Sequence, residues 1–439
     1  MDEVFELINK EKQRQEDEIC LIASENYMSQ NVLDACGTVL INKYSEGYPN
    51  KRYYGGCHVI DEIEQLAIDR ACELFSCKYA NVQPNSGCQA NQAVYMAVCK
   101  PGDTILAMGV NEGGHISHSL SIGFAGTFYN VVEYGLTDDG FLNYNELKEK
   151  LYNKHPRLLI VGGSAYPREI DFKKIGEIVS NYNTLTNYPC IYMVDMAHIA
   201  GLVAAKEHIS PIPYADVVTS TVQKTLRSGR GGIILTNDEQ LIKKINSAVF
   251  PRIQGGPLNN MIAAKAVGFG EALQPEFKKY IRQVKKNIQE MVKIFKQFDV
   301  DMMTSGSDNH LILLDLKKEN FSGADLEKLL ESVGIITNKN SVKGDTRPKM
   351  ETSGLRIGTA CITSRGIKEK TAAFIAMQIC YCIEILRGTF DYNSTELLRV
   401  RNEDGSIDYD TDIKTLVLND IKDKIKELCE DYPIYKERK

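Results

Sequence analysis

The sequence predicts an α/β fold in which a mostly parallel mixed sheet forms a large domain and a small α+β domain follows it. Between about residues 31 and 250, apolar strand-like runs such as Thr104–Met108 and Leu158–Gly162 alternate with amphipathic helical runs. This alternation is typical of a parallel sheet with helices on both faces. Further along, the strand-like run His310–Leu316 and a helical pattern over residues 375–386 indicate a second core.

The chain is expected to divide into three parts. Its first stretch alternates a charged helical pattern with a short apolar segment, which is typical of an arm that packs on another surface. A long helical pattern from Leu258 to Phe298 is interrupted at Pro275, because proline removes a helix hydrogen bond. Near the end of the chain, Leu355–Gly358 indicates a short strand at a sheet edge. The expected parts are an N-terminal arm (1–30), a large domain (31–275) and a small C-terminal domain (276–439).

Composition narrows the class of protein. The 439 residues carry a formal net charge of -6 and a pI near 5.8, which argues against a nucleic-acid or anionic-membrane partner. No apolar run approaches the ~18 residues of a membrane span, and the acidic N-terminus has no signal-peptide pattern. Twelve cysteines without a CxxC pair predict reduced thiols in the cytoplasm and no metal site, with Cys380 and Cys382 in a helical core.

Two polar residues follow neighbouring strand-like runs. The apolar run Cys190–Val194 ends at Asp195, at the carboxyl edge where open α/β sheets place ligands. A second run, Ala215–Val218, leads through hydroxyl residues to Lys224. Pyridoxal phosphate needs such a pair, because a lysine forms the Schiff base with its aldehyde and an acid keeps its pyridine nitrogen protonated. Either residue alone is more often a helix cap or a solvated side chain.

Other segments can complete a phosphate and substrate site. Ser86 and Gly87 open a predicted helix whose backbone N–H groups can bind a phosphate, although such a turn is usually only an N-cap. Gly114 precedes His115, whose imidazole could stack on an aromatic cofactor. Arg230 could reach a phosphate, and Gln254–Pro257 reads as a second backbone anion site.

A tyrosine-rich, glycine-rich loop at Tyr44–Gly56 suits a binding site better than a core. Arg356 could hold a substrate carboxylate through two parallel hydrogen bonds.

The chain resembles serine hydroxymethyltransferases, which are pyridoxal-phosphate enzymes of the aspartate aminotransferase fold (fold type I). The similarity runs nearly end to end, and the spacing between His115 and Asp195 resembles the bacterial form of the family. The most specific segments are KYSEGYPNKRYYGG at Lys43–Gly56, NVQPNSG at Asn81–Gly87, VDMAHIAGLVA at Val194–Ala204, QGGPL at Gln254–Leu258 and TSGLRIGT at Thr352–Thr359.

The resemblance implies that the serine hydroxymethyl group is transferred reversibly to tetrahydrofolate as co-substrate, which leaves glycine. Lys224 would hold the coenzyme covalently, Asp195 its pyridine nitrogen and His198 its ring hydroxyl, while His115 would stack on the ring. Glu46 would be the acid/base residue, and Arg356 would bind the substrate carboxylate. Further coenzyme-binding residues would be Ser86, Gly87, Cys88, Ser164, Gln223 and Arg230, joined by Tyr44, Gly255 and Gly256 from a neighbouring subunit. Further substrate- and folate-binding residues would be Ser24, Tyr53, Tyr54, Gly114, Ile116 and Asn340.

A site shared in this way implies a homodimer or homotetramer. The chain departs from the family pattern next to the lysine, where Val222 and Gln223 replace a threonine and a histidine, and at Cys88, which replaces a serine. At Val222 the change removes a hydroxyl near the coenzyme, and Gln223 cannot titrate. The stretch Pro348–Met350 also differs. Two alternatives therefore stay open: a folate-independent 3-hydroxy-amino-acid aldolase, and a catalytically weakened paralogue with a binding role.

Overall fold

The computed structural model describes residues 2–390 and 413–435. Contacts between Cα atoms divide the chain into two compact units. The first, here called the sheet unit, comprises residues 24–282 and 308–310; the second, the terminal unit, comprises residues 1–23, 283–307 and 311–439. These bounds differ from residues 30 and 275, and the predicted three-part division stays a prediction.

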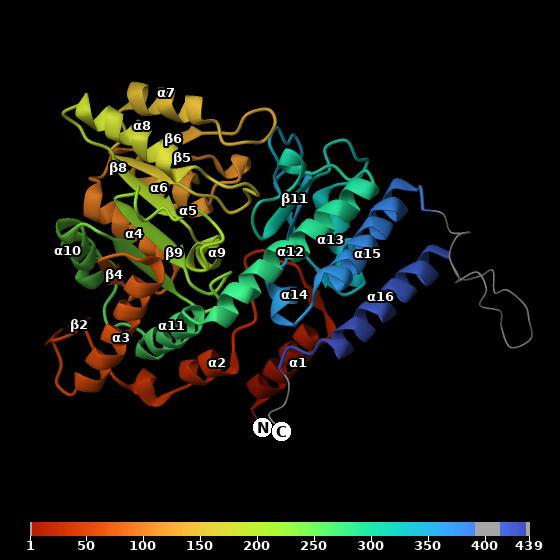
Figure 1. Ribbon diagram of the computed structural model, residues 1–439, viewed down its shortest axis with the longest axis horizontal. Helices are drawn as coiled ribbons and strands as arrows, with labels where there is room; N and C mark the ends of the chain where they lie inside the picture. Colours follow the sequence, from red (N-terminus) through yellow and green to blue (C-terminus); the bar gives the residue numbers. More distant parts are fainter. Residues whose placement is uncertain (1, 391–412, 436–439) are drawn as a thin grey trace, which may run out of the picture. The chain divides into compact units, whose positions relative to one another are not determined.

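A seven-stranded mixed sheet forms the centre of the sheet unit (Figure 1). Strand β10 is antiparallel to both its neighbours, and the pairings from β9 to β6 are all parallel. This arrangement confirms the mostly parallel mixed sheet that the alternating sequence pattern predicts. In spatial order the strands are β4 (Tyr79–Asn81), β10 (Gly232–Thr236), β9 (Val217–Thr221), β8 (Ile191–Asp195), β7 (Leu158–Val161), β5 (Thr104–Met108) and β6 (Asn130–Tyr134).

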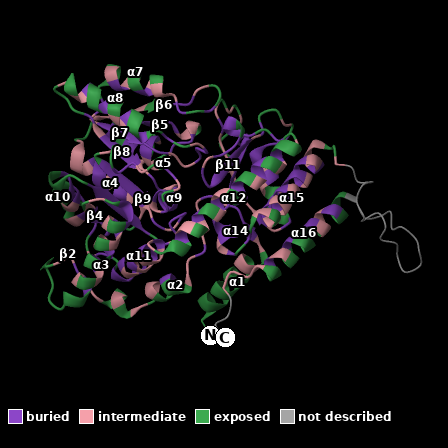
Figure 2. Ribbon diagram, in the orientation of Figure 1, coloured by how far each residue is buried: buried purple, intermediate pink, exposed green. Residues whose placement is uncertain are grey.

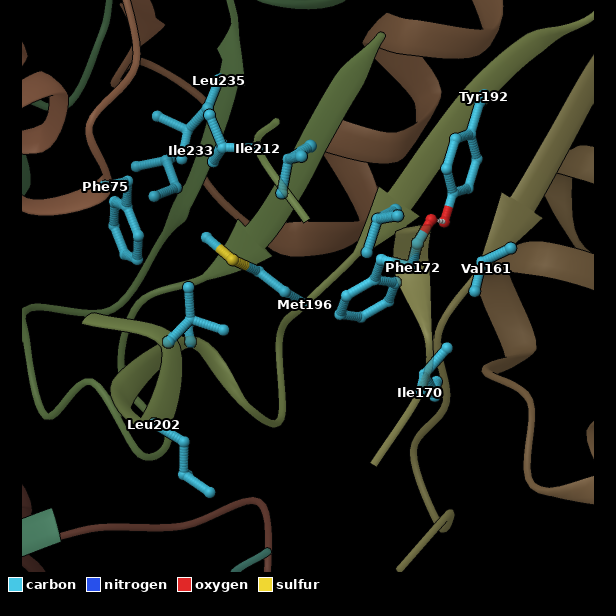
Figure 3. Packing of buried hydrophobic residues seen from close by; sticks show 14 of the residues in the cluster. Phe75, Val161, Ile170, Phe172, Tyr192, Met196, Leu202, Ile212, Ile233 and Leu235 are labelled. Atoms are coloured by element: carbon cyan, nitrogen blue, oxygen red, sulfur yellow. Dashed lines mark hydrogen bonds between the residues drawn. The ribbon is translucent and has the colours of Figure 1, made fainter. Parts of the chain in front are cut away.

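Helices cover both faces of this sheet, so its central strands are apolar on both sides. Leu158 and Ile160 of β7 pack into one hydrophobic cluster, whereas Leu159 and Val161 pack into the other. The cluster around Phe172 is shown in Figure 3. On the face of Leu158 lie α4 (Gly87–Val98), α6 (Phe124–Phe128) and α10 (Glu239–Ser247). On the other face lie α3 (His58–Phe75), α7 (Tyr144–Lys154), α8 (Phe172–Thr184), α9 (Ala200–Ala204) and α11 (Asn259–Ala272).

The segments between the longer helices and strands of the sheet unit contain several short elements. The hairpin β2–β3 (Gly47–Tyr48 and Lys51–Arg52) lies within the tyrosine-rich loop. Ser86 accepts a hydrogen bond from the Gln89 N–H group and so caps α4, as its position before the helix predicts. The remaining elements are α2 (Gln30–Cys36), α5 (Ile116–Ser119), the 3₁₀ helices η1 (Val39–Asn42) and η2 (Val110–Glu112), and the π-helical segment η3 (Ala248–Ile253).

The helical pattern around Pro275 is confirmed as two helices, α11 and α12 (Pro275–Gln297). Proline takes the first position of α12, where its missing N–H costs nothing. Phe277 and Ile281 of α12 belong to the core of the sheet unit, and Ile288 belongs to the core of the terminal unit.

The terminal unit contains a three-stranded antiparallel sheet in the order β11 (Leu311–Asp315), β14 (Gly354–Gly358) and β13 (Asn338–Asn340). The expectation of an edge strand at Leu355–Gly358 is wrong, because β14 is the central strand. Its five residues are all buried, but a run this short, interrupted by Arg356 and bounded by glycines, lacks the continuous apolar pattern by which a strand buried on both faces is predicted. The other elements are α1 (Glu3–Asp17), β1 (Ile19–Cys20) parallel to β12 (Ile335–Ile336), η4 (Met303–Ser305), α13 (Gly323–Ser332), α14 (Ala360–Ser364), α15 (Glu369–Arg387) and α16 (Ile413–Asp431).

Burial follows the sheet and the inner faces of the helices (Figure 2). Ile375, Ile379 and Ile383 are fully buried on one face of α15, as their spacing predicts. Within the described residues, no helix is long and apolar enough to cross a membrane.

Candidate active site

The Asp195 carboxylate stands at the carboxyl end of β8 and is held by three donors. Its Oδ2 atom accepts from Asn91 Nδ2 at 2.9 Å and pairs with His118 Nε2 at 2.9 Å. Its Oδ1 atom accepts from the backbone N–H group of Ala197 at 3.0 Å. These contacts fix the plane of the carboxylate and leave Oδ1 with room for one further donor.

The same surroundings keep Asp195 ionised. Burial raises the pKa of its carboxyl group, but the hydrogen bonds from His118 and Asn91 and the electrostatic influence of the His118 and His115 side chains outweigh burial. The resulting pKa lies well below the ordinary value of an aspartate. An anion of this kind suits the role that the sequence assigns to Asp195, namely holding a protonated ring nitrogen.

His115 lies beside this carboxylate at the start of α5. Its Nδ1 atom accepts from the Ser117 N–H group and lies 2.7 Å from Ser117 Oγ, so the ring orientation is fixed. The rings of His115 and His118 have centroids 5.5 Å apart. The glycine before His115 permits this path, because a Cβ atom on Gly114 would lie 2.2 Å from the Met108 carbonyl oxygen. Ser164 is anchored nearby, with its N–H group donating to the Gly113 carbonyl at 2.8 Å.

Lys224 follows β9, the strand that pairs with β8, and Asp195 is in register with Thr219. The lysine is buried, with 8% of its surface exposed. Its carbonyl accepts from Asn26 Nδ2 at 2.9 Å. The next residue, Thr225, donates to the His198 carbonyl at 2.8 Å and accepts from the Gly201 N–H group at 3.0 Å. The lysine loop is therefore tied to the segment that follows Asp195.

The residues around Lys224 that depart from the family pattern lie in different surroundings. Val222 is fully buried in the hydrophobic cluster of the sheet unit, so it is a core residue. The predicted loss of a polar contact near the coenzyme stays a prediction, and the valine side chain itself packs against apolar groups. By contrast, Gln223 Oε1 and Thr221 Oγ1 are buried without a hydrogen-bond partner among the described residues.

The turn that opens α4 carries Ser86, Gly87 and Cys88. A Cβ atom on Gly87 would lie 2.5 Å from Thr221 Cγ2, so glycine allows the turn to touch the end of β9. Burial and the charge of Asp195 raise the pKa of the Cys88 thiol, while a hydrogen bond with Ser117 and the charge of Lys224 oppose this rise. Cys88 thus lies within electrostatic range of both Asp195 and Lys224.

His198 is buried, and its Nδ1 atom lies 3.4 Å from His310 Nε2, with the two rings stacked. Arg230 is exposed in the loop after the lysine.

A second group of predicted residues gathers at the tyrosine-rich loop. The rings of Tyr44 and Tyr54 meet edge to face at 5.5 Å. A Cβ atom on Gly256 would lie 2.9 Å from the Tyr44 ring, and one on Gly255 would lie 3.2 Å from Glu46 Oε1. The structure therefore brings these five residues together within one chain. Tyr53 contacts Phe250 edge to face and is 75% exposed. Ile116 is also exposed, and Ser24 is partly buried within the sheet unit.

Two predicted residues belong to the terminal unit. Arg356 lies on β14 and donates through Nε to Asn338 Oδ1 at 3.1 Å. Burial lowers the pKa of its guanidinium group to about 10. Asn340 lies on the neighbouring strand β13, in register with Gly354.

Comparisons with known proteins identify the family. A family model described as serine hydroxymethyltransferase matches residues 1–379. The chain is 48% identical to a serine hydroxymethyltransferase of Orientia tsutsugamushi (strain Ikeda) over 434 residues, which cover 99% of each chain. It is 50% identical to that of Campylobacter hominis over 387 residues, covering 88% of this chain and 92% of the relative. The serine hydroxymethyltransferase of Phenylobacterium zucineum (strain HLK1) is 52% identical over 364 residues, covering 83% of each. The chain belongs to the serine hydroxymethyltransferase family.

Membership of the serine hydroxymethyltransferase family implies fold type I and a pyridoxal-phosphate-dependent one-carbon transferase. Its reaction transfers the hydroxymethyl group of serine to tetrahydrofolate and yields glycine. The residues of this chain fit the coenzyme. An ionised, oriented carboxylate and a buried lysine lie on adjoining strand ends, together with two buried oxygen atoms, Thr221 Oγ1 and Gln223 Oε1, that have no hydrogen-bond partner among the described residues. Across the described residues, no group of three histidine, cysteine or acidic side chains is placed to hold a metal ion.

Four residues of this site have no assigned role in the sequence analysis: Asn26, Asn91, His118 and Thr225. Each acts through a contact distant in sequence; Asn91, for example, lies 104 residues from Asp195. Of the four, only His118 carries a local signal, because it follows His115 by one helical turn.

Proposed function

We propose that Lys224 is the covalent attachment point of pyridoxal phosphate and that Asp195 holds its pyridine nitrogen. The register of β8 and β9 carries this proposal, because it sets Asp195 and the start of the lysine loop on adjoining strand ends. When bound, the coenzyme supplies an electron-withdrawing pyridinium ring. The low pKa of Asp195 means that its carboxylate keeps that ring nitrogen protonated throughout neutral pH.

Further coenzyme roles follow from the same cluster. His115, fixed by Ser117, would stack on the ring, and His198 would bind the ring hydroxyl. The phosphate would bind the N–H groups at the start of α4 and the Ser86 hydroxyl, which also caps that helix. The other phosphate and ring contacts in this proposal are Gly87, Cys88, Ser164, Gln223 and Arg230.

The proposal assigns further residues to the amino-acid substrate and to folate. Arg356, whose Asn338 contact orients the guanidinium, would bind the carboxylate of serine or glycine. Glu46 would transfer the proton of the serine hydroxyl group. The remaining amino-acid contacts would be Ser24 and Tyr54, and the folate contacts would be Tyr53, Gly114, Ile116 and Asn340. In this assignment the terminal unit serves as the small α+β domain of the fold.

The chain would act as a homodimer or homotetramer with shared sites. Tyr44 and Gly255 support this proposal because both are exposed. By the family resemblance, these residues would contact the coenzyme of a neighbouring subunit. A cytoplasmic location is supported by the twelve cysteines, all of which are free thiols.

The lysine assignment is tested by replacing Lys224 with alanine. The purified variant should lose the visible absorbance that the wild-type protein gains with pyridoxal phosphate, while it still binds the coenzyme reversibly. The matched control is Lys244→Ala, which removes an exposed lysine on α10 and should keep the absorbance. Retention of the absorbance in Lys224→Ala would overturn the assignment.

The folate role is tested by adding glycine and then tetrahydrofolate to the wild-type holoenzyme. A new visible band that becomes strong only with both compounds supports a folate-coupled site. A response to glycine that ignores tetrahydrofolate would instead favour the aldolase alternative.

A further inference from the structure

A lysine with no assigned function lies buried beneath the turn that opens α4. Lys265 belongs to α11 and has 1% of its surface exposed. Its Nζ atom donates to three carbonyl oxygens: Val82 at 2.6 Å, Pro84 at 2.9 Å and Gly232 at 3.1 Å. An ammonium group has three N–H bonds and no acceptor, so these three carbonyls use all its hydrogens.

The three carbonyls join the two segments that meet under Ser86. Val82 and Pro84 belong to the stretch between β4 and α4, and Gly232 begins β10. The Gly232 N–H group also donates to the Pro84 carbonyl at 2.8 Å. Without Lys265, the Val82 carbonyl would lose its donor in a place that water cannot reach.

Glycines allow the ammonium group to occupy this position. A Cβ atom on Gly231 would lie 2.3 Å from Lys265 Cε and 2.6 Å from its Nζ atom. A Cβ atom on Gly232 would lie 2.4 Å from the Ser86 carbonyl oxygen. Because these two glycines have no side chains, the backbone at the start of β10 can contact both the lysine and the turn that carries Ser86.

The opposite side of the same stretch is held by a neutral amide. Gln254 donates to the Gln83 carbonyl and accepts from the Asn85 N–H group, both at 3.1 Å. Lys265 and Gln254 together thus bind four consecutive residues, 82–85, that lead directly into Ser86. These residues have no regular secondary structure, and the two side chains replace the sheet hydrogen bonds that would otherwise hold them.

The lysine also brings a positive charge without a bound counter-ion. In the described part of the chain no ion pair joins Lys265 to a carboxylate. Glu64 acts on it only through longer-range attraction, since Arg52 and Gln83 bind that carboxylate directly. Burial lowers the pKa of the Lys265 ammonium group to about 7. An isolated buried cation is costly, and this cost falls when an anion binds nearby.

We propose that Lys265 is a positioning residue for the phosphate end of the coenzyme: it fixes the stretch before Ser86 and places a buried positive charge under the phosphate-binding turn. The inference rests on the proposed function, because it takes the start of α4 to be the phosphate site. It adds a second role for α11, which otherwise packs as a core helix.

The test compares two ligands that differ only in the phosphate group. Apoprotein is titrated with pyridoxal 5′-phosphate and, separately, with pyridoxal, and binding is followed by visible absorbance. Lys265→Met removes the charge and the donors with little change of volume. We expect it to weaken binding of the phosphorylated compound about tenfold or more and binding of pyridoxal less than about twofold. Lys265→Gln keeps donors but not the charge, and should give a smaller loss of the same selectivity.

Phe269→Leu is the matched control, since Phe269 is fully buried one helical turn along α11 and carries neither a charge nor a hydrogen-bond donor. It should lower stability while leaving the ratio of the two affinities unchanged. The proposal is overturned if both lysine variants keep the wild-type ratio within about twofold, or if Phe269→Leu changes that ratio equally. It is also overturned if neither lysine variant folds, because Lys265 would then be required for the fold itself. Failure of the wild-type apoprotein to bind either compound would instead refute the proposed function.

Discussion

Replacing Asn91 with aspartate would place two carboxylates side by side in the core of the site. Asn91 Nδ2 lies 2.9 Å from Asp195 Oδ2, while Asn91 Oδ1 accepts from Thr219 Oγ1 at 2.6 Å. The variant keeps the acceptor for Thr219 and replaces only the donor by an oxygen. Two negative charges 2.9 Å apart would repel by about 6 kcal/mol at an effective dielectric constant of about 20. Taking up one proton at pH 7 costs less, about 4 kcal/mol for a group with an unfolded pKa of about 3.9.

The carboxylate pair should therefore share one proton in the folded state. Its folded pKa lies above the unfolded value, so the stability lost by the variant is small near pH 4 and grows as pH rises. The loss should be about 1.5 kcal/mol at pH 5 and about 4 kcal/mol at pH 7, a slope of about 1.4 kcal/mol per pH unit.

Urea unfolding of the apoprotein, followed by circular dichroism because the chain has no tryptophan, measures this difference. Asn91→Leu is the matched control, and its loss of stability should be the same at pH 5 and pH 7, because it adds no titratable group. An equal loss at both pH values for Asn91→Asp would refute the placement of Asn91 beside Asp195.

Three further changes test other parts of the structure. Thr225→Val should lower the unfolding free energy by about 3 kcal/mol in urea unfolding, because the buried His198 carbonyl and Gly201 N–H group both lose their partner; a loss below about 0.5 kcal/mol would contradict the contacts. Gln223→His should leave turnover unchanged or faster in a steady-state assay with serine and tetrahydrofolate, and a large loss would show that the site is adapted to glutamine. Arg365→Met should destabilise the terminal unit by about 3–5 kcal/mol in thermal unfolding, because the buried guanidinium donates to five carbonyls from both ends of the chain; the exposed Arg14→Ala should change little.

Local patterns in the sequence predict the strands and the helix start at Ser86. The buried strands β5, β7 and β8 are continuous apolar runs, and such runs need no knowledge of their neighbours. The Ser86 cap and the break at Pro275 depend only on backbone chemistry within one turn. By contrast, the central position of β14 depends on which strands pair with it, and five residues do not encode that.

The partners of the predicted site residues could not be found in the same way. Asp195 is predicted because it ends a strand, but its low pKa depends on Asn91 and His118, which come from two separate helices. Lys265 has an apolar helical neighbourhood in the sequence, and only the folded chain shows three carbonyls converging on its ammonium group. Polar side chains in a core are identified by what they bond to, and the bond from Lys265 to the Val82 carbonyl joins residues 183 positions apart.

Three departures from the family pattern near the lysine and the phosphate-binding turn differ in their surroundings. Val222 packs into the apolar core of the sheet unit. Cys88 has a raised pKa and stays a neutral thiol at neutral pH, which makes it a weak hydrogen-bond donor in place of a hydroxyl. Gln223 differs from both, because its buried Oε1 atom has no partner among the described residues and therefore gains a hydrogen bond from any donor brought to it. A glutamine oxygen can accept such a bond but cannot take up a proton, so Gln223 can orient a bound group and cannot act as its base.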